Sequence, residues 1–110
     1  MAMFIAVFVR RLRPGKTYED FLRAWYPDKG FGVPARVTTA TNVADEREVL
    51  TIGVMDAELS PEALQAVAPR EAVRHDRLDD VVESTTLRAF YDVEAEFDFS
   101  TDETVAEGRP

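Results

Sequence analysis

The chain of 110 residues contains no cysteine, one histidine and one tryptophan. Without cysteine it forms no disulfide, no thiolate nucleophile and no cysteine-based zinc or iron–sulfur site. Its longest apolar run, Met1–Val9, is about half as long as the roughly 20 residues that a membrane-spanning helix needs. The run also lacks the cationic start and the small-residue cleavage site of a secretory signal. We therefore expect a cytoplasmic protein that makes no membrane contact.

Basic residues are too few to favour a nucleic-acid partner. Lys and Arg number 13 against 21 Asp and Glu, which gives a formal net charge of −8, and a negative protein repels a phosphate backbone. Most of the excess acid lies at the C-terminal end, where seven acidic residues from Asp92 to Glu107 face one arginine. We expect one domain over residues 1–99 and a flexible acidic tail over residues 100–110. A tail that binds a partner is the alternative.

Hydrophobic residues make up 45% of the chain, which is enough for one globular core. The segments rich in β-branched and aromatic residues predict four strands, at Met3–Leu12, Ala35–Val43, Glu48–Met55 and Thr85–Phe97. Helical spacing predicts one helix from Thr17 to Trp25 and a second that begins at Ser60. Pro69 is expected to interrupt this second helix, and a further helical stretch to run over Arg70–Glu83.

The predicted element order is β-α-β-β-α-β. Two interleaved right-handed β-α-β crossovers give an α+β, ferredoxin-like fold, with both helices on one face of a four-stranded antiparallel sheet. The spatial order of the strands, numbered along the chain, is then 4-1-3-2.

The two central strands are apolar on both faces, although the helices can cover only one. We assign to the helix side Ile5, Val7, Val9, Leu50, Ile52 and Val54. We assign to the bare face Phe4, Phe8, Thr51, Gly53, Met55 and Phe90. Several hundred Å² of exposed apolar surface would forfeit on the order of 10 kcal/mol, so we expect a homodimer through the bare face. The alternative is a mixed face, or one that the C-terminal segment covers.

This architecture resembles the dimeric α/β-barrel superfamily, whose members include antibiotic-biosynthesis-type monooxygenases, muconolactone isomerase and haem-degrading monooxygenases. The resemblance covers about residues 3–98 and depends on the element order and the two-faced central strands rather than on a motif. It implies a dimer that stacks sheet on sheet into a closed barrel. It also implies a ligand cavity between the sheet and the helices or at the mouth of the barrel.

His75 is the only side chain whose unperturbed pKa lies near neutrality, so it is our first catalytic candidate. In haem-degrading relatives a histidine on the second helix is the iron ligand. Those relatives also have an asparagine on the first strand and a tryptophan on the second helix. Neither partner residue is present here, and we expect no haem or other cofactor. A proton-transfer role is one hypothesis for His75, and a place among surface charges is the other.

Arg10, Arg88 and Asp92 form a second constellation, because the strands that carry them should be neighbours. Two guanidinium groups in a low-dielectric cavity can hold a carboxylate or a developing enolate, and Asp92 could orient them. A structural ion pair at the dimer seam is the alternative. Metal binding is not expected, since one histidine and scattered carboxylates supply no recognisable ligand set.

Aromatic side chains are the expected walls of a ligand pocket, at Phe8, Trp25, Tyr26, Phe31 and Phe90. The same residues could equally be core. We expect a metal-free oxygenase or isomerase that acts on a small apolar or aromatic molecule, with His75, Arg10 and Arg88 as its catalytic groups. The alternative is a non-catalytic dimer that binds a small ligand or assists another protein.

Overall fold

The computed structural model describes residues 3–25 and 33–101. The elements follow the predicted order: β1 (Phe4–Leu12), α1 (Tyr18–Trp25), β2 (Ala35–Asn42), β3 (Asp45–Met55), α2 (Pro61–Arg77) and β4 (Val82–Asp92). Among the described residues, no helix has both the length and the apolar character needed to cross a membrane.

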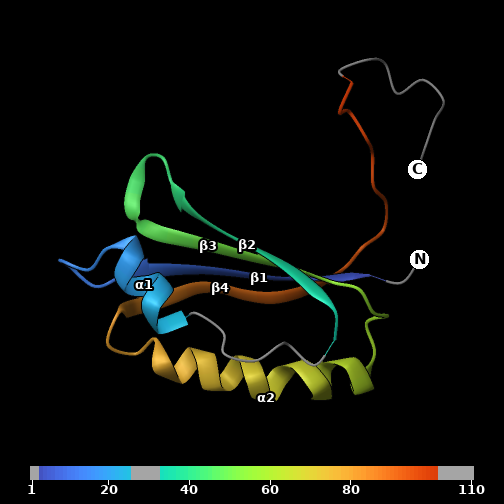
Figure 1. The fold of residues 1–110 in the computed structure, drawn as a ribbon, viewed down its shortest axis with the longest axis horizontal. Coiled ribbons are helices and arrows are strands. Elements are labelled where there is room, and N and C mark those ends of the chain that lie inside the picture. The colour runs from blue at the N-terminus through green and yellow to red at the C-terminus, as the bar shows by residue number, and fades with distance from the viewer. Residues whose placement is uncertain (1–2, 26–32, 102–110) are drawn as a thin grey trace.

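The four strands form one antiparallel sheet in the order β2-β3-β1-β4. This is the predicted order 4-1-3-2 read from the other edge. Both helices lie on one side of the sheet, and α2 runs along its length (Figure 1). The α+β, ferredoxin-like fold is therefore confirmed.

Both helices begin at the side-chain caps that the sequence predicts. The backbone N–H of Thr17 donates to the Asp20 carboxylate, and the Asp20 N–H donates to the Thr17 hydroxyl, which is a reciprocal capping box. The bond from the Thr17 backbone lowers the pKa of Asp20. The Ser60 hydroxyl accepts from the N–H of Ala63, and Pro61 occupies the first turn of α2.

The second helix and the last strand differ from their predicted limits. Helix α2 continues through Pro69 and ends at Arg77, so the predicted interruption is wrong. An internal proline costs a helix about 3 kcal/mol. Here Pro69 is exposed, while the opposite side of the helix is buried. Strand β4 ends at Asp92 rather than Phe97, because Asp92 already pairs with Phe4, the first residue of β1.

The predicted assignment of the two sheet faces is reversed. The face toward the helices carries Phe4, Ala6, Phe8, Val49, Thr51, Gly53 and Met55, all buried. Phe4, Ala6 and Phe8 belong to one core cluster with Ala63 and Val67 of α2. Ile5, Val7 and Val9 alternate with them and remain partly exposed. Alternation identifies the residues that share a face, but when both rows are apolar it does not say which row the helices cover.

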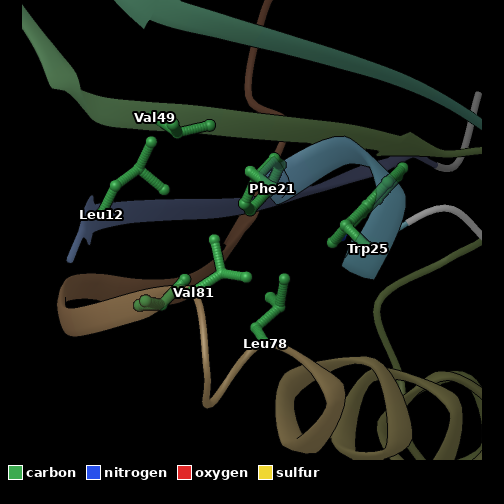
Figure 2. Close-up of a cluster of buried hydrophobic side chains, with 7 residues drawn as sticks. Leu12, Phe21, Trp25, Val49, Leu78 and Val81 are labelled. Atoms are coloured by element: carbon green, nitrogen blue, oxygen red, sulfur yellow. The ribbon is translucent and has the colours of Figure 1, made fainter. Parts of the chain in front are cut away.

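A second core cluster closes the other end of the covered face. It joins Leu12, Val49 and Val82 of the sheet to Phe21 and Trp25 of α1 and to Leu78 and Val81, which lie between α2 and β4. Figure 2 shows Phe21 and Trp25 of α1 between the sheet and Leu78. The rings of Phe21 and Trp25 are stacked with centroids 6.3 Å apart. The two clusters leave a middle region of the covered face where polar residues are buried.

Candidate functional site

A small cavity lies between the sheet and the helices. It has a volume of about 20 Å³, which is room for about one water molecule. Its wall is apolar except for two side chains, Thr51 and Glu71. The lining comprises Ala6, Phe8, Trp25, Val37, Thr51, Gly53, Met55, Val67, Glu71 and Phe90.

Small residues at the middle of the sheet leave this space open. Ala6 of β1 pairs with Gly53 of β3 on one side and with Phe90 of β4 on the other. A Cβ atom on Gly53 would lie 2.9 Å from the terminal methyl group of Met55. Glycine at this position therefore lets the flexible Met55 side chain lie across the sheet, where it forms part of the cavity wall.

A buried ion pair lies beside the cavity. Arg10 of β1 is 1% exposed, and its Nη2 is 3.4 Å from Oε1 of Glu71 on α2. Nη2 of Arg88, from β4, is 3.7 Å from the same oxygen. The Arg10 guanidinium also stacks over the Phe8 ring, 4.6 Å from its centroid. One carboxylate thus faces two guanidinium groups from adjacent strands.

Several buried polar atoms of this region have no hydrogen-bond partner among the described residues. They are Nε and Nη1 of Arg10, the Thr51 hydroxyl and Nδ1 of His75. A buried donor without an acceptor costs about 1–3 kcal/mol, and more when it is charged. Such groups call for an acceptor oxygen, from water or from a ligand.

Burial and positive charge control the ionisation of these groups. Burial raises the pKa of Glu71, although the charges of Arg10 and Arg88 oppose the rise. Burial lowers the pKa of Arg10, and Glu71 opposes that shift. The third basic residue near Glu71 is Arg74, which is buried and lies over the Trp25 ring at 6.0 Å. Three arginines, Arg10, Arg74 and Arg88, therefore lie close enough to the Glu71 carboxylate to act on its ionisation.

His75 lies one helical turn after Glu71, at the edge of this cluster. Burial lowers its pKa, and the positive charges of Arg88 and Arg10 lower it further. His75 does not line the apolar cavity. It borders an open groove of about 490 Å³ between the end of α2 and the start of β4, with Asp76, Leu78, Asp79, Val82, Glu83, Ser84 and Thr85.

The structure brings most of the predicted site residues into one region. Phe8, Trp25 and Phe90 line the cavity, and Arg10 and Arg88 meet at Glu71. All of them lie on the covered face rather than on the bare face. Their functional roles remain predictions. Two further predicted residues, Tyr26 and Phe31, lie outside the described residues.

Asp92 does not join the two arginines. It pairs with Phe4, six residues along β1 from Arg10, which corresponds to about 20 Å along the strand. Its side chain is exposed. Glu71, rather than the predicted Asp92, lies beside the two guanidinium groups.

Glu71, Arg74 and Thr51 are the site residues that sequence reasoning missed. The buried side of α2 repeats at helical spacing, with Ala63, Val67, Glu71 and Arg74. Two charged residues in that apolar row are the signal that could have revealed a buried polar site. Thr51 carries no such signal, because threonine is common in strands.

Metal-ligand groups do not converge in the described part of the chain. Across residues 3–25 and 33–101, no set of three or more His, Asp or Glu side chains could hold a metal ion.

The acidic residues that flank His75 in the groove, Asp76 and Asp79, raise its pKa, but burial and the two arginines lower it by more.

Comparison with known proteins identifies the fold. A proposed antibiotic biosynthesis monooxygenase from Chloroflexus aurantiacus superposes with a TM-score of 0.57 at 16% identity, over 88% of this chain and 98% of that one. A protein from Shewanella oneidensis gives a TM-score of 0.62 at 17% identity, over 84% and 91% of the two chains. A dimeric ferredoxin-like protein of unknown function from Bacteroides fragilis gives 0.54 at 15%, over 84% and 98%.

The class that these findings define is a ferredoxin-like α+β protein with the architecture of the antibiotic-biosynthesis-monooxygenase-like structures. The resemblance inferred from the sequence is confirmed at the level of the fold. No family profile matches the chain, and no curated protein is significantly similar to it.

Proposed function

We propose that the protein is a homodimer that binds a small apolar molecule bearing an oxygen anion, in the cavity between its sheet and α2. One observation carries this proposal. The Arg10 guanidinium is buried, and two of its nitrogens have no partner among the described residues. Arg10 lies behind the cavity wall, next to Phe8 and Glu71, which line it. Because a guanidinium holds carboxylate or enolate oxygens well, an anionic ligand that reaches past this wall would satisfy it. Phe8, Trp25 and Phe90 would contact the apolar part of the ligand.

The open face of the sheet supports the homodimer. Three apolar rows cross it, in which Ile5 pairs with Val54 and Tyr91, Val7 with Ile52 and Ala89, and Val9 with Leu50 and Leu87. Leu87 and Tyr91 are 37% and 48% exposed. A two-fold axis would bury these rows against their own copy. The Bacteroides fragilis protein of the same fold is dimeric.

Within this proposal the reaction is an oxygenation or an isomerisation. Both begin with removal of a proton from the ligand and need a group that stabilises the resulting enolate. Arg10 and Arg88 are the enolate partners, and His75, whose pKa is lowered by burial and by the two arginines, is the proton acceptor. Glu71, whose pKa is raised, is a second candidate for proton transfer. The fold shared with the Chloroflexus aurantiacus protein supports the oxygenase form.

The place of His75, outside the cavity, favours a second candidate function, ligand binding without catalysis. A ring needs more than about 20 Å³. It would enter by displacing the flexible side chain of Met55. His75 borders the groove rather than the cavity, so a ring bound in the cavity would not touch it directly. Oxygen uptake or isomerisation of a bound ligand would decide between the two functions.

Trp25 makes the binding proposal testable, because it is the only tryptophan and it lines the cavity. Benzoate should quench its fluorescence with at least tenfold higher affinity than uncharged benzyl alcohol. Arg10→Met should remove this preference, while Lys16→Met, at an exposed residue, should leave it unchanged. Met55→Ala should strengthen the binding of both probes by enlarging the cavity. An Arg10→Met protein that still prefers benzoate would refute the anion site.

A further inference from the structure

Glu71 lies between the cavity and the buried Arg10 guanidinium. The Glu71 side chain lines the cavity, and its Oε1 is 3.4 Å from Nη2 of Arg10 and 3.7 Å from Nη2 of Arg88. Neither arginine lines the cavity itself. A ligand anion that enters the cavity therefore meets the Glu71 carboxylate before it meets a guanidinium.

The three charged groups come from three elements that pack together. Arg10 belongs to β1 and Arg88 to β4, which are adjacent strands, and Glu71 belongs to α2, which runs along the covered side of the sheet (Figure 1). Glu71 is 5% exposed, so solvent screens its charge little. Its carboxylate already occupies the position in which the carboxylate of a ligand would pair with Arg10.

Unused hydrogen-bond donors surround this position. Thr51 of β3 lines the same cavity and is 3% exposed, and its hydroxyl has no partner among the described residues. Nε and Nη1 of Arg10 also have no partner there, because Glu71 accepts only from Nη2. Thr51 pairs with Phe8, two residues before Arg10 on β1. A ligand carboxylate has two oxygens and can supply acceptors to both side chains.

We propose that Glu71 holds the anion position beside Arg10 in the free protein and yields it to an anionic ligand by taking up one proton from solvent. This role of Glu71 rests on the proposed anion site and adds the way in which that site is controlled. Two carboxylates that share one buried site do not both stay ionised, because their like charges repel. Burial already raises the pKa of Glu71. The neutral acid can then donate its O–H to the ligand carboxylate, which is a strong charge-assisted hydrogen bond.

The other titratable groups around Glu71 are less suited to take up this proton. Arg10 on β1, Arg88 on β4 and Arg74 on α2 act on Glu71, but arginine keeps its proton in proteins. His75, one turn later on α2, titrates closer to neutrality, yet it borders the open groove rather than the cavity. Apart from Glu71, the cavity lining carries no ionisable side chain. A proton taken up with the ligand therefore goes to Glu71.

Binding of benzoate at different pH values tests this role, with the fluorescence of Trp25 as the signal. Benzoate keeps its charge between pH 8 and pH 6, so a change in its affinity reports on the protein. The affinity of the wild type should rise about fivefold or more over this range, because binding and proton uptake are linked. Glu71→Gln should bind benzoate at least tenfold more tightly than the wild type at pH 8, with an affinity that does not change with pH.

The matched control is Glu62→Gln, the same change at an exposed position of the same helix. It should keep both the affinity and the pH dependence of the wild type. If Glu71→Gln binds benzoate no more tightly than the wild type, or keeps the rise in affinity, another group such as His75 takes the proton. The proposed role of Glu71 is then wrong, while the anion site stands.

Calorimetry of the wild type tests the proton directly and needs no variant. Titrations with benzoate at pH 7, in two buffers of different ionisation enthalpy, should show net uptake of protons. Binding without uptake overturns the role of Glu71 even if Glu71→Gln does not fold. If neither protein prefers benzoate to uncharged benzyl alcohol at pH 6, the anion site itself fails, and the role of Glu71 fails with it.

Discussion

The two faces of the sheet carry similar apolar side chains but have different surroundings. The covered face contains Phe4, Phe8 and Leu12, which are at most 5% exposed. The same face contains the buried Arg10, paired with Glu71 of α2. The open face carries Ile5, Val7 and Val9, which nothing in the described chain covers. Folding of one chain therefore buries the first face and leaves the second partly exposed.

The two faces also place polar residues in different surroundings. Strand β1 holds adjacent arginines that point to opposite faces. Arg11 lies at the rim of the open face and bonds to Asp45, a contact that raises the pKa of Arg11 and lowers that of Asp45. Arg10 lies under α2, and burial lowers its pKa. The same residue type is thus a surface ion-pair partner on one face and a desolvated cation on the other.

The largest expected effect comes from truncating the covered face. Phe4→Ala should lower the free energy of unfolding by about 3–5 kcal/mol, because Phe4 is fully buried. Ile5→Ala, the next residue on the open face, should lower it by about 1 kcal/mol at concentrations where the chain is monomeric. Urea unfolding of both variants measures the difference. Equal losses would contradict the assignment of the two faces.

A glutamate placed on the open face should weaken association without unfolding the chain. A glutamate placed on the covered face should unfold the chain. Val7→Glu should raise the dimer dissociation constant about 100-fold, or about 2.7 kcal/mol, and leave the circular dichroism spectrum of the fold unchanged. Ala6→Glu, one residue earlier and 2% exposed, should unfold the chain instead. Sedimentation and circular dichroism of the pair make the comparison. An unaltered association constant for Val7→Glu would exclude the open face as the interface.

Substitutions of the two residues of the buried ion pair should have non-additive effects on the free energy of unfolding. Glu71→Ala leaves Arg10 charged and buried without its counter-charge and also leaves a cavity under α2, so we expect a loss of about 2 kcal/mol in stability. Adding Arg10→Met should recover part of that loss, since the uncompensated charge is then absent. Chemical unfolding of the two single variants and the double variant gives the coupling. Simple additivity would show that Glu71 does not stabilise Arg10.

The smallest expected effect is the pH dependence that His75 contributes. Its pKa is lower in the folded chain than in the unfolded one. The unfolded state therefore binds the proton more tightly, and His75 makes the fold less stable as the pH falls from 6.5 through the folded pKa. Between pH 7.5 and 5.5, the free energy of unfolding of the wild type should fall relative to that of His75→Gln. A difference that does not change with pH would argue against this shift.

Glu71 should act in the opposite direction at lower pH. Its pKa is raised in the folded chain, so its contribution to stability is present below the unfolded value and is lost as the pH rises through the folded pKa. Comparison of the wild type with Glu71→Gln between pH 4 and 7 isolates this contribution. The two profiles together test whether burial shifts both groups toward their neutral forms.

Much of the fold was predictable because its signals are local. The caps at Thr17 and Ser60 and the alternation of the strands each involve a few neighbouring residues. The site was predictable in part. Arg10 and Arg88 were identified by their position on adjacent strands, whereas Glu71 reaches them from α2, 61 residues beyond Arg10 in the chain. No local pattern indicates which helical turn will lie over which strand.

The sequence by itself determined the element order, the antiparallel topology and an apolar excess on both faces of the sheet, because each follows from spacing along the chain. Only the tertiary structure decided which face the helices cover, that α2 runs through Pro69, and that β4 stops at Asp92. Those outcomes depend on contacts between segments far apart in the chain. They are set by the volume that Phe4 and Phe8 fill beneath α2 and by the point at which β1 begins.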